Sequence, residues 1–201
     1  MRGDGDGWVL SDTGARFWGH HGAAGLLLRA PLPGGAPAVL LQHRAPWSHQ
    51  GGTWGLPGGA RDSHETAEQA AVREAHEEAG LPVEKVLVRA AVVTARASGS
   101  RWTYTTVVAD APHPLKTVPN MESAELRWVL EEQVHELPLH PGFAASWHRL
   151  RSTVASVPEQ PGLPRTVELG SGEFVWCTPA APGDDPSPLS DRLSALLQAL
   201  R

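Results

Sequence analysis

Residues 59–81 read GARDSHETAEQAAVREAHEEAGL, and they are the most informative stretch of the chain. Their middle predicts an α-helix, because Thr66 is a suitable N-cap and Gln69, three residues later, completes a capping box. Most of the residues that follow are good helix formers. Gly80 is a suitable C-terminal stop, and Pro82 prevents the helix from continuing. We therefore expect one helix between these two signals.

The predicted helix has two different sides. Glu74, Glu77 and Glu78 stand at positions i, i+3 and i+4, so their carboxylates share one face. The other side carries small apolar residues that can pack closely against a sheet, namely Ala67, Ala71, Val72, Ala75 and Ala79. Like charges on one face repel one another, and a hard divalent cation would offset that repulsion. Mg²⁺ prefers oxygen ligands, is usually held by a few carboxylates, and completes its shell with water and substrate phosphates.

Residues before the helix complete this candidate site. In LPGGA, residues 56–60, the paired glycines Gly58 and Gly59 allow the backbone to approach a metal closely, so that a carbonyl there can be a ligand. Arg73 points to the neighbouring side of the helix, where Glu65 or another carboxylate can hold it and fix the helix against the preceding loop. A solvated acidic helix with a capped start would explain the glutamates, but not the two glycines, the arginine or their spacing.

The spacing of these residues resembles a family signature. The pattern G-x5-E-x7-R-E-U-x-E-E-x-G-U, where U is apolar, is the signature of the Nudix hydrolases. It is matched here by Gly59, Glu65, Arg73, Glu74, Ala75, Glu77, Glu78, Gly80 and Leu81, although Ala75 is smaller than the usual aliphatic residue. Residues 58–81, which contain this signature and the preceding Gly58, are called the box below. The resemblance implies an α/β Nudix fold, an α/β/α sandwich with a mixed sheet between helices. It also implies metal ligands at Gly59, Glu74, Glu77 and Glu78, with structural support from Gly58, Glu65 and Gly80.

A second stretch resembles one branch of that family. Residues 44–59, RAPWSHQGGTWGLPGG, look like the MutT-type branch of nucleoside triphosphate pyrophosphohydrolases. This resemblance implies that Arg44 contacts a substrate phosphate; the alternative is a strand end that faces solvent. Trp47 and Trp54 flank the loop, and either can stack on a base. Packing within the loop is the more common role for a tryptophan.

Further site residues are expected downstream. In the segment MESAELRWV, Glu122 stands six residues before Trp128, which resembles the position of an additional metal-binding glutamate in MutT-type enzymes. Glu125 is the second candidate for that role. Arg101 and Tyr104 belong to an alternating, β-rich segment and can reach the substrate, or can form an ordinary hairpin surface.

The resemblance implies metal-dependent hydrolysis of a phosphoanhydride bond. Mg²⁺ or Mn²⁺ held by the carboxylates would screen the phosphate charge, and a nearby carboxylate would take a proton from water. Glu74 and Glu122 are the candidate bases, and the expected catalytic set also contains Glu78 and Arg73. A nucleoside triphosphate, in its normal or oxidised form, would give a nucleoside monophosphate and pyrophosphate.

Several alternatives stay open at this point. Nudix enzymes of the ADP-ribose branch carry a proline about sixteen residues beyond the box, where this chain has Ala97. Those of the dinucleoside polyphosphate branch carry a tyrosine about seventeen residues beyond it, where this chain has Ser98. The spacing at Arg44 therefore favours a nucleoside triphosphate, with ADP-ribose or another nucleotide sugar as the alternative. Two other classes are a nucleotide-sensing Nudix domain without turnover, which usually lacks box carboxylates, and a domain stabilised by a structural metal.

The remaining pattern predicts the other elements. Apolar and alternating runs predict strands at 22–29, 38–44, 86–95 and 101–109, and a second long helix at 139–154. Short runs at 8–10 and 16–18 predict a small hairpin, and 166–178 predicts another that turns at 170–172. Glu131 and Glu132 favour the start of a further helix, because acidic residues suit the positive end of its dipole. An amphipathic helix is expected at 189–200.

The length of 201 residues, 41% of them hydrophobic, suits one globular domain with additions. We expect an N-terminal extension at 1–21, a Nudix domain at 22–154, and a C-terminal extension at 155–201 packed on the same domain. The helix expected in the last part could also form the contact of a homodimer.

Composition limits the partners of the protein. The net charge of −5, without a long basic run, argues against a nucleic-acid duplex. No apolar run is long enough to span a membrane, and the start MRGDGDGW lacks the apolar core of a secretory signal. The single Cys177 excludes an internal disulfide and suits a reducing compartment. We therefore expect a cytoplasmic protein that acts on a small nucleotide.

Overall fold

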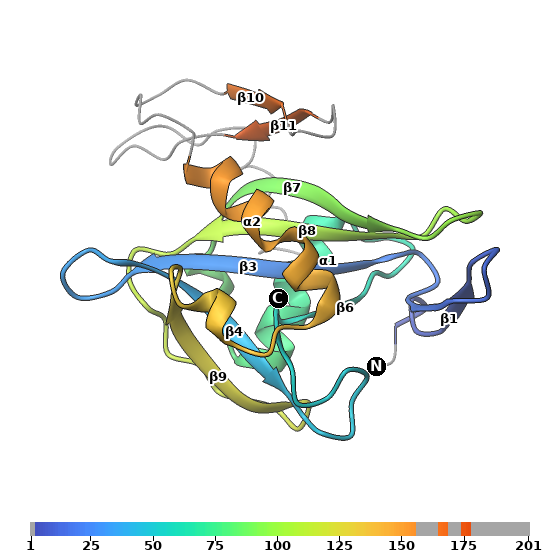
Figure 1. The fold of residues 1–201 in the computed structure, drawn as a ribbon, viewed down its shortest axis with the longest axis horizontal. Helices are drawn as coiled ribbons and strands as arrows, with labels where there is room; N and C mark the ends of the chain where they lie inside the picture. The colour runs from blue at the N-terminus through green and yellow to red at the C-terminus, as the bar shows by residue number, and fades with distance from the viewer. Residues whose placement is uncertain (1–2, 156–164, 169–173, 178–201) are drawn as a thin grey trace.

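The computed structural model describes residues 3–155, 165–168 and 174–177, which form a sheet and two long helices with small additions (Figure 1). The strands are β1 (Trp8–Leu10), β2 (Arg16–Trp18), β3 (Ala23–Pro31), β4 (Pro37–Arg44), β5 (Trp54–Gly55), β6 (Gly58–Ala60), β7 (Leu87–Arg96), β8 (Thr103–Asp110), β9 (Ser123–Leu130), β10 (Arg165–Glu168) and β11 (Phe174–Cys177). The helices are α1 (Ala67–Ala79), α2 (Pro141–Ala155), and the 3₁₀ turns η1 (Val83–Lys85) and η2 (Val134–Glu136).

The central sheet is mixed, and its topology positions the glycines of the box. Its strands follow the order β5-β4-β3-β8-β7; in addition β6 pairs with β3, and β9 pairs with β4. Only β3 and β8 run parallel to each other among these pairs. The start of β3 pairs with β6, where Ala24 lies opposite Gly59 and Gly25 opposite Gly58, whereas its end pairs with β4. The box glycines are therefore held beside the beginning of β3.

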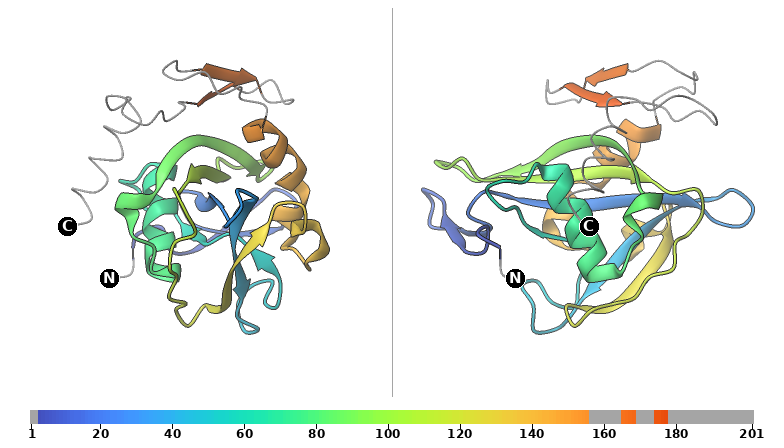
Figure 2. Two further views of the ribbon diagram at one scale, coloured as in Figure 1. Left: turned by 90° about the vertical axis from the view of Figure 1, so that its left-hand side faces the viewer. Right: turned by 180° about the vertical axis from the view of Figure 1, so that it is seen from behind.

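The two helices lie on opposite faces of the sheet, as Figure 2 shows. Because side chains alternate along a strand, Leu26 and Leu28 of β3 pack in one core cluster with α1, whereas Leu27 packs in the other with α2. Phe143 and Trp147 of α2 belong to the second cluster. This arrangement confirms the predicted α/β/α sandwich.

The small N-terminal hairpin is present where the sequence predicts it. Its strands β1 and β2 are antiparallel, with Val9 opposite Phe17. These two side chains pack on a third apolar cluster that contains Trp102. The hairpin is thus attached to the same end of the sheet at which β3 begins.

Most element boundaries agree with the predictions to within a few residues. β10 and β11 pair antiparallel as expected for a C-terminal hairpin. The turn expected at 170–172 and the helix expected at 189–200 lie outside the described residues. Among the described residues, no helix is long and apolar enough to cross a membrane.

One predicted element is wrong. Glu131 and Glu132 do not begin a helix; they lie in a turn that is followed only by the short η2. Glu131 is buried and forms ion pairs with Arg29 of β3 and Arg151 of α2. Its carboxylate therefore joins the sheet to a helix, and this tertiary pairing replaces the local preference for a helix N-terminus.

Candidate active site

Helix α1 begins and ends at the predicted residues. The Thr66 hydroxyl accepts a hydrogen bond from the Gln69 amide, and the Gln69 side chain accepts one from the Thr66 amide. Gly80 closes the helix in a left-handed conformation, with φ of 62°, and its amide donates to the carbonyl of His76. Buried alanines on the opposite side keep the helix close to the sheet. The position of the glutamate face is therefore fixed relative to β3.

The two box glycines lie directly against the carboxylates of α1. The Gly58 amide donates a hydrogen bond of 2.8 Å to Oε2 of Glu78. A Cβ on Gly59 would lie 2.6 Å from Oε1 of Glu74, and one on Gly58 would lie 2.4 Å from the carbonyl oxygen of Ala24. A side chain at Gly58 would therefore collide with the backbone of β3, whereas one at Gly59 would displace the carboxylate of Glu74.

Arg73 is held as the sequence predicts. Its Nε and Nη2 donate to the two carboxylate oxygens of Glu65, at 2.6 and 2.9 Å. Its Nη1 donates to Oε1 of Glu74, at 2.9 Å, and lies 3.4 Å from Oε2 of Glu77. Burial alone would raise the pKa of Glu65, but the hydrogen bonds from Arg73 and from the Asp62 amide outweigh it and lower that pKa. The arginine thus joins the loop to the helix and orients two box carboxylates.

Four carboxylates concentrate negative charge at this point. Burial, together with the nearby charges of Glu77 and Glu122, raises the pKa of Glu74 to about 7, although Arg73 opposes this shift. Burial and the charges of Glu74 and Glu122 also raise the pKa of Glu78, against the hydrogen bond from Gly58. The side chain of Glu77 is more than half exposed. The protein alone therefore leaves this negative charge poorly compensated.

The structure separates the two candidates for the additional glutamate. Glu122 lies in the loop before β9, and its carbonyl accepts a hydrogen bond from the amide of Ala45. In the same loop, the backbone amide of Asn120 donates to the carbonyl of Glu78. These contacts bring Glu122 to the carboxylate cluster. Glu125 lies opposite His43 in the sheet and pairs with Arg127 instead.

Arg44 lies beside the carboxylate cluster. It ends β4, and its Nε donates a hydrogen bond of 2.9 Å to the carbonyl of His49. Its charge acts on Glu78, where it lowers the pKa against the stronger effect of burial. The site thus combines an acidic face with one adjacent guanidinium, an arrangement suited to a metal-bound phosphate chain.

Comparison with known proteins identifies the family. A model described as the NUDIX domain matches residues 19–150. The chain belongs to the Nudix hydrolase family. The crystal structure of RenU, a Nudix hydrolase from M. smegmatis, matches this chain with a TM-score of 0.75 and 73% sequence identity. The match covers 79% of this chain and 100% of the RenU chain. The chain is thus an enzyme of the Nudix class.

A second relative spans nearly the whole of this Nudix hydrolase. It is a Mycobacterium tuberculosis protein provisionally named 8-oxo-dGTP diphosphatase 3, which is 65% identical over 206 residues and covers 98% of this chain and 95% of its own. The crystal structure of a C. elegans Ap4A hydrolase complex has a TM-score of 0.54 at 23% identity, covers 66% of this chain and 96% of its own, and supports the fold alone.

The two tryptophans of the loop have different environments in this Nudix hydrolase. Trp47 is 68% exposed and remains a candidate for stacking. Trp54 is only 5% exposed, its ring stacks on His43 with 4.8 Å between centroids, and the Arg127 guanidinium lies 4.8 Å from its centroid. The prediction that Trp54 stacks on a base is therefore wrong, and the alternative role in packing is correct. Its neighbours come from β4 and β9, which the local sequence could not indicate.

Tyr104 and Arg101, the other two predicted substrate-binding residues, also have different environments. Tyr104 is half-buried, and a Cβ on Gly25 would lie 2.0 Å from its hydroxyl oxygen, so that the ring fits only beside a glycine. Burial and the charges of Glu78 and Glu74 raise the pKa of the phenol, which therefore stays protonated beside the site. Arg101 lies in the exposed turn between β7 and β8, and its predicted contact with substrate stays a prediction.

Sequence reasoning missed His140, which precedes α2. Its amide donates to the carbonyl of Trp54, and its Nδ1 lies 3.1 Å from the amide of Gly142, which donates to it. Burial, together with the charges of Arg44 and His49, lowers the pKa of His140 to about 4. The imidazole is therefore neutral and carries its proton on Nε2. No local pattern links this residue to Arg44; only the fold brings them together.

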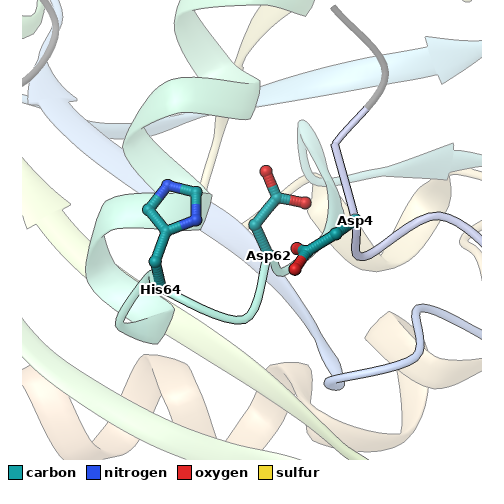
Figure 3. A group of neighbouring side chains, drawn as sticks. All are labelled: Asp4, Asp62 and His64. Atoms are coloured by element: carbon teal, nitrogen blue, oxygen red, sulfur yellow. The ribbon is translucent and has the colours of Figure 1, made fainter.

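An additional group of polar side chains lies on the N-terminal side of the box. Asp4, Asp62 and His64 have ligand atoms within 4.8 Å of one another (Figure 3). The carboxylate of Asp4 accepts from the amide and hydroxyl of Ser63, and Asp62 Oδ1 accepts from the amide of Gly5. These bonds attach the N-terminal segment to the loop that precedes α1.

Proposed function

We propose that this Nudix hydrolase cleaves a nucleoside triphosphate into a nucleoside monophosphate and pyrophosphate, with an oxidised guanine nucleotide such as 8-oxo-dGTP as the first candidate. The observation that carries the proposal is the position of Arg44 beside the four-carboxylate cluster, since its charge reaches Glu78. The provisional name of the M. tuberculosis relative at 65% identity supports this choice of substrate.

The carboxylate cluster fits a divalent cation. All of its donors are oxygen atoms, burial and the neighbouring carboxylates raise the pKa values of Glu74 and Glu78, and the missing side chain at Gly59 leaves room for Glu74. We therefore assign Mg²⁺ or Mn²⁺ to Glu74, Glu77, Glu78, Glu122 and the carbonyl of Gly59. When bound, such a cation screens phosphate charge and makes a water molecule more acidic.

The residues around the cluster have distinct tasks in this proposal. Arg44 binds phosphate oxygens, because a guanidinium offers several donors in one plane. Tyr104 stays protonated and can donate its hydroxyl hydrogen to the substrate. Arg73 is a positioning residue, since it holds Glu74 through Nη1 and is itself held by Glu65.

Two carboxylates are candidates for the catalytic base. Glu74 is held by Arg73, whereas Glu122 is exposed in its loop. The base takes a proton from the attacking water, so its replacement should lower kcat more than it weakens metal binding. Comparison of Glu74→Gln with Glu122→Gln, by kcat and by calorimetric titration with Mn²⁺, tests which of them acts as the base.

The substrate is tested by a hydrolysis screen of the purified full chain with Mg²⁺ or Mn²⁺. The panel contains normal and oxidised nucleoside triphosphates, ADP-ribose, other nucleotide sugars and dinucleoside polyphosphates, with products separated by chromatography. We expect an oxidised guanine nucleotide to be turned over with the highest kcat/KM and to release pyrophosphate. Preferred turnover of ADP-ribose or of a nucleotide sugar would contradict the proposed substrate while leaving the hydrolase class intact.

A control separates true turnover from contamination and from nucleotide sensing. Glu78→Gln should abolish hydrolysis while the melting temperature stays close to that of the wild type. If the wild type hydrolyses nothing in the panel but is thermally stabilised by a nucleotide, the chain is a sensor and the proposed function is wrong.

A further inference from the structure

The N-terminal segment, residues 3–21, is hydrogen-bonded to two loops of the Nudix domain. Asp4 and Gly5 hydrogen bond to the loop that precedes α1, through Ser63 and Asp62. At the other end of the hairpin, the amide of Asp12 donates to the carbonyl of Ser98 between β7 and β8. The segment is therefore held in place from two sides rather than attached only by its covalent connection to β3.

The hairpin β1–β2 turns one apolar face inward and leaves the other exposed. On the inner face, Phe17 packs on Trp102 with 4.6 Å between ring centroids. On the outer face, Trp8 and Trp18 are 45% and 40% exposed, although they are opposite each other in the register and in edge contact at 5.1 Å. Large aromatic side chains that stay exposed as a pair often mark a binding surface.

This exposed pair lies next to the phosphate-binding side of the proposed site. The ring of Trp8 contacts that of His49, with 6.2 Å between centroids, and His49 accepts the hydrogen bond from Arg44 through its carbonyl. The chain enters β3 directly after the hairpin, and β3 holds the box glycines at its first residues. The Trp8–Trp18 surface and the carboxylate cluster are thus joined through one loop and one strand end.

We propose that Trp8 and Trp18 form an aromatic surface for the base of the nucleotide whose phosphates contact Arg44 and the carboxylates. The two rings lie at 74° to each other, so the base stacks on the face of one ring and contacts the other at its edge. This inference rests on the proposed function. A base extends beyond its phosphate chain and gains free energy by stacking on an aromatic face. Arg16, whose guanidinium lies 5.3 Å from the Trp8 ring centroid, covers part of that ring and helps to hold its orientation. The N-terminal hairpin then belongs to the substrate site.

The test compares a ligand that has a base with one that has none. Steady-state kinetics use the nucleoside triphosphate that the wild type hydrolyses best, and inorganic tripolyphosphate serves as a competitive inhibitor. Trp8→Ala and Trp18→Ala should both raise KM with little change in kcat, roughly 5- to 100-fold for the ring on which the base stacks and less for the ring that it contacts at the edge. The inhibition constant of tripolyphosphate should stay within about twofold of the wild-type value, because this ligand makes no stacking contact.

Two matched variants distinguish stacking from a general effect of the hairpin. Trp8→Phe keeps an aromatic face and should retain most of the affinity. Leu10→Ala changes an exposed residue of the same outer face and should alter neither constant. All variants should melt near the wild-type temperature, since the contact of Trp18 with the Trp102 indole uses the backbone carbonyl.

Three results would overturn the inference. The first is an unchanged KM in both alanine variants. The second is an inhibition constant of tripolyphosphate that rises in parallel with KM, because this would mean that the hairpin only shapes the phosphate site through His49. A variant that changes from dimer to monomer on size exclusion, with KM unchanged, would assign the surface to a second copy of the chain.

The inference and the proposed function fail separately. Hydrolysis of a nucleoside triphosphate with a KM that is insensitive to Trp8 and Trp18 rejects only the stacking surface. If no nucleotide is hydrolysed, calorimetric binding of a nucleoside monophosphate replaces kinetics. Weaker binding of the monophosphate to Trp8→Ala, with binding of inorganic phosphate unchanged, would then support the stacking surface although hydrolysis is rejected.

Discussion

The box around α1 and the rim formed by the N-terminal segment are built from contacts of very different range. Arg73 and Glu65 are eight residues apart, and Gly58 and Glu78 are twenty apart. The rim is attached by hydrogen bonds between more distant residues: Gly5 and Asp62 are 57 positions apart, and Ser98 and Asp12 are 86 apart. The box is thus built mainly from contacts between residues that are close in sequence, whereas the position of the rim depends on the completed fold.

The largest effect should follow from Glu78→Gln inside the box. The amide side chain can still accept the hydrogen bond from Gly58 but removes a charge from the proposed metal site, so kcat/KM should fall at least about 100-fold. Removal of a buried charge should leave the free energy of unfolding unchanged or slightly higher. Equal activity in wild type and variant, measured under saturating Mg²⁺, would break the assignment of the chemistry to the box.

The two box glycines should respond differently to alanine. In Gly58→Ala the new Cβ meets the backbone of β3, which cannot move away, so we expect a loss of roughly 1–3 kcal/mol in the free energy of unfolding. In Gly59→Ala it meets the end of the Glu74 side chain, which can move, so activity should fall roughly 10- to 100-fold with a smaller loss of stability. Urea unfolding and steady-state kinetics measure both effects.

Gly142→Ala is the control for this pair. Its Cβ would lie 3.4 Å from its nearest neighbour, the flexible imidazole of His140. It should behave almost like the wild type in unfolding. Equal losses in all three alanine variants would show that glycine flexibility, rather than the close approach to β3 and Glu74, controls stability.

Arg73→Lys should separate the positioning role from simple charge. A lysine keeps the charge but cannot donate two parallel hydrogen bonds to Glu65, so the free energy of unfolding should fall by roughly 1–3 kcal/mol and activity should fall with it. Arg127→Lys is the control, because its pair with Glu125 is exposed and a lysine can keep a cation near the Trp54 ring, so this change should cost less than about 1 kcal/mol. Thermal and urea unfolding of both variants would reveal whether this order is reversed.

The smallest effect concerns the pH dependence that His140 gives to stability. The folded chain keeps His140 neutral down to about pH 4, whereas the unfolded chain protonates it near pH 6.5. The unfolded state therefore binds more protons between these values, and the stabilisation present above pH 6.5 is lost as pH falls towards 4. The expected loss is on the order of 1 kcal/mol after allowance for solvent screening. In His140→Gln the free energy of unfolding should depend less on pH between about 4 and 6.5 than in the wild type. The same pH dependence in both proteins would contradict the lowered pKa of His140.

Much of the box could be predicted because its determinants are close in sequence. The capping residues and the alternation of glutamates with alanines follow from helix geometry, and Glu65, in the loop before the helix, is only eight residues from Arg73. The environments of Trp54 and Glu131 could not be predicted in this way. Trp54 is buried by His43 and Arg127 from neighbouring strands, and Glu131 pairs with Arg29 across the sheet.

By itself, the sequence determined the helix, its acidic face and the diglycine turn, because hydrogen bonds and steric limits within about twenty residues are sufficient to specify them. Only the tertiary structure decided that Glu122 rather than Glu125 reaches the cluster, that His140 lies near Arg44, and that the N-terminal hairpin borders the site. The reason is that strand pairing determines which distant segments meet, and each of these residues is brought to the site by a different strand or loop.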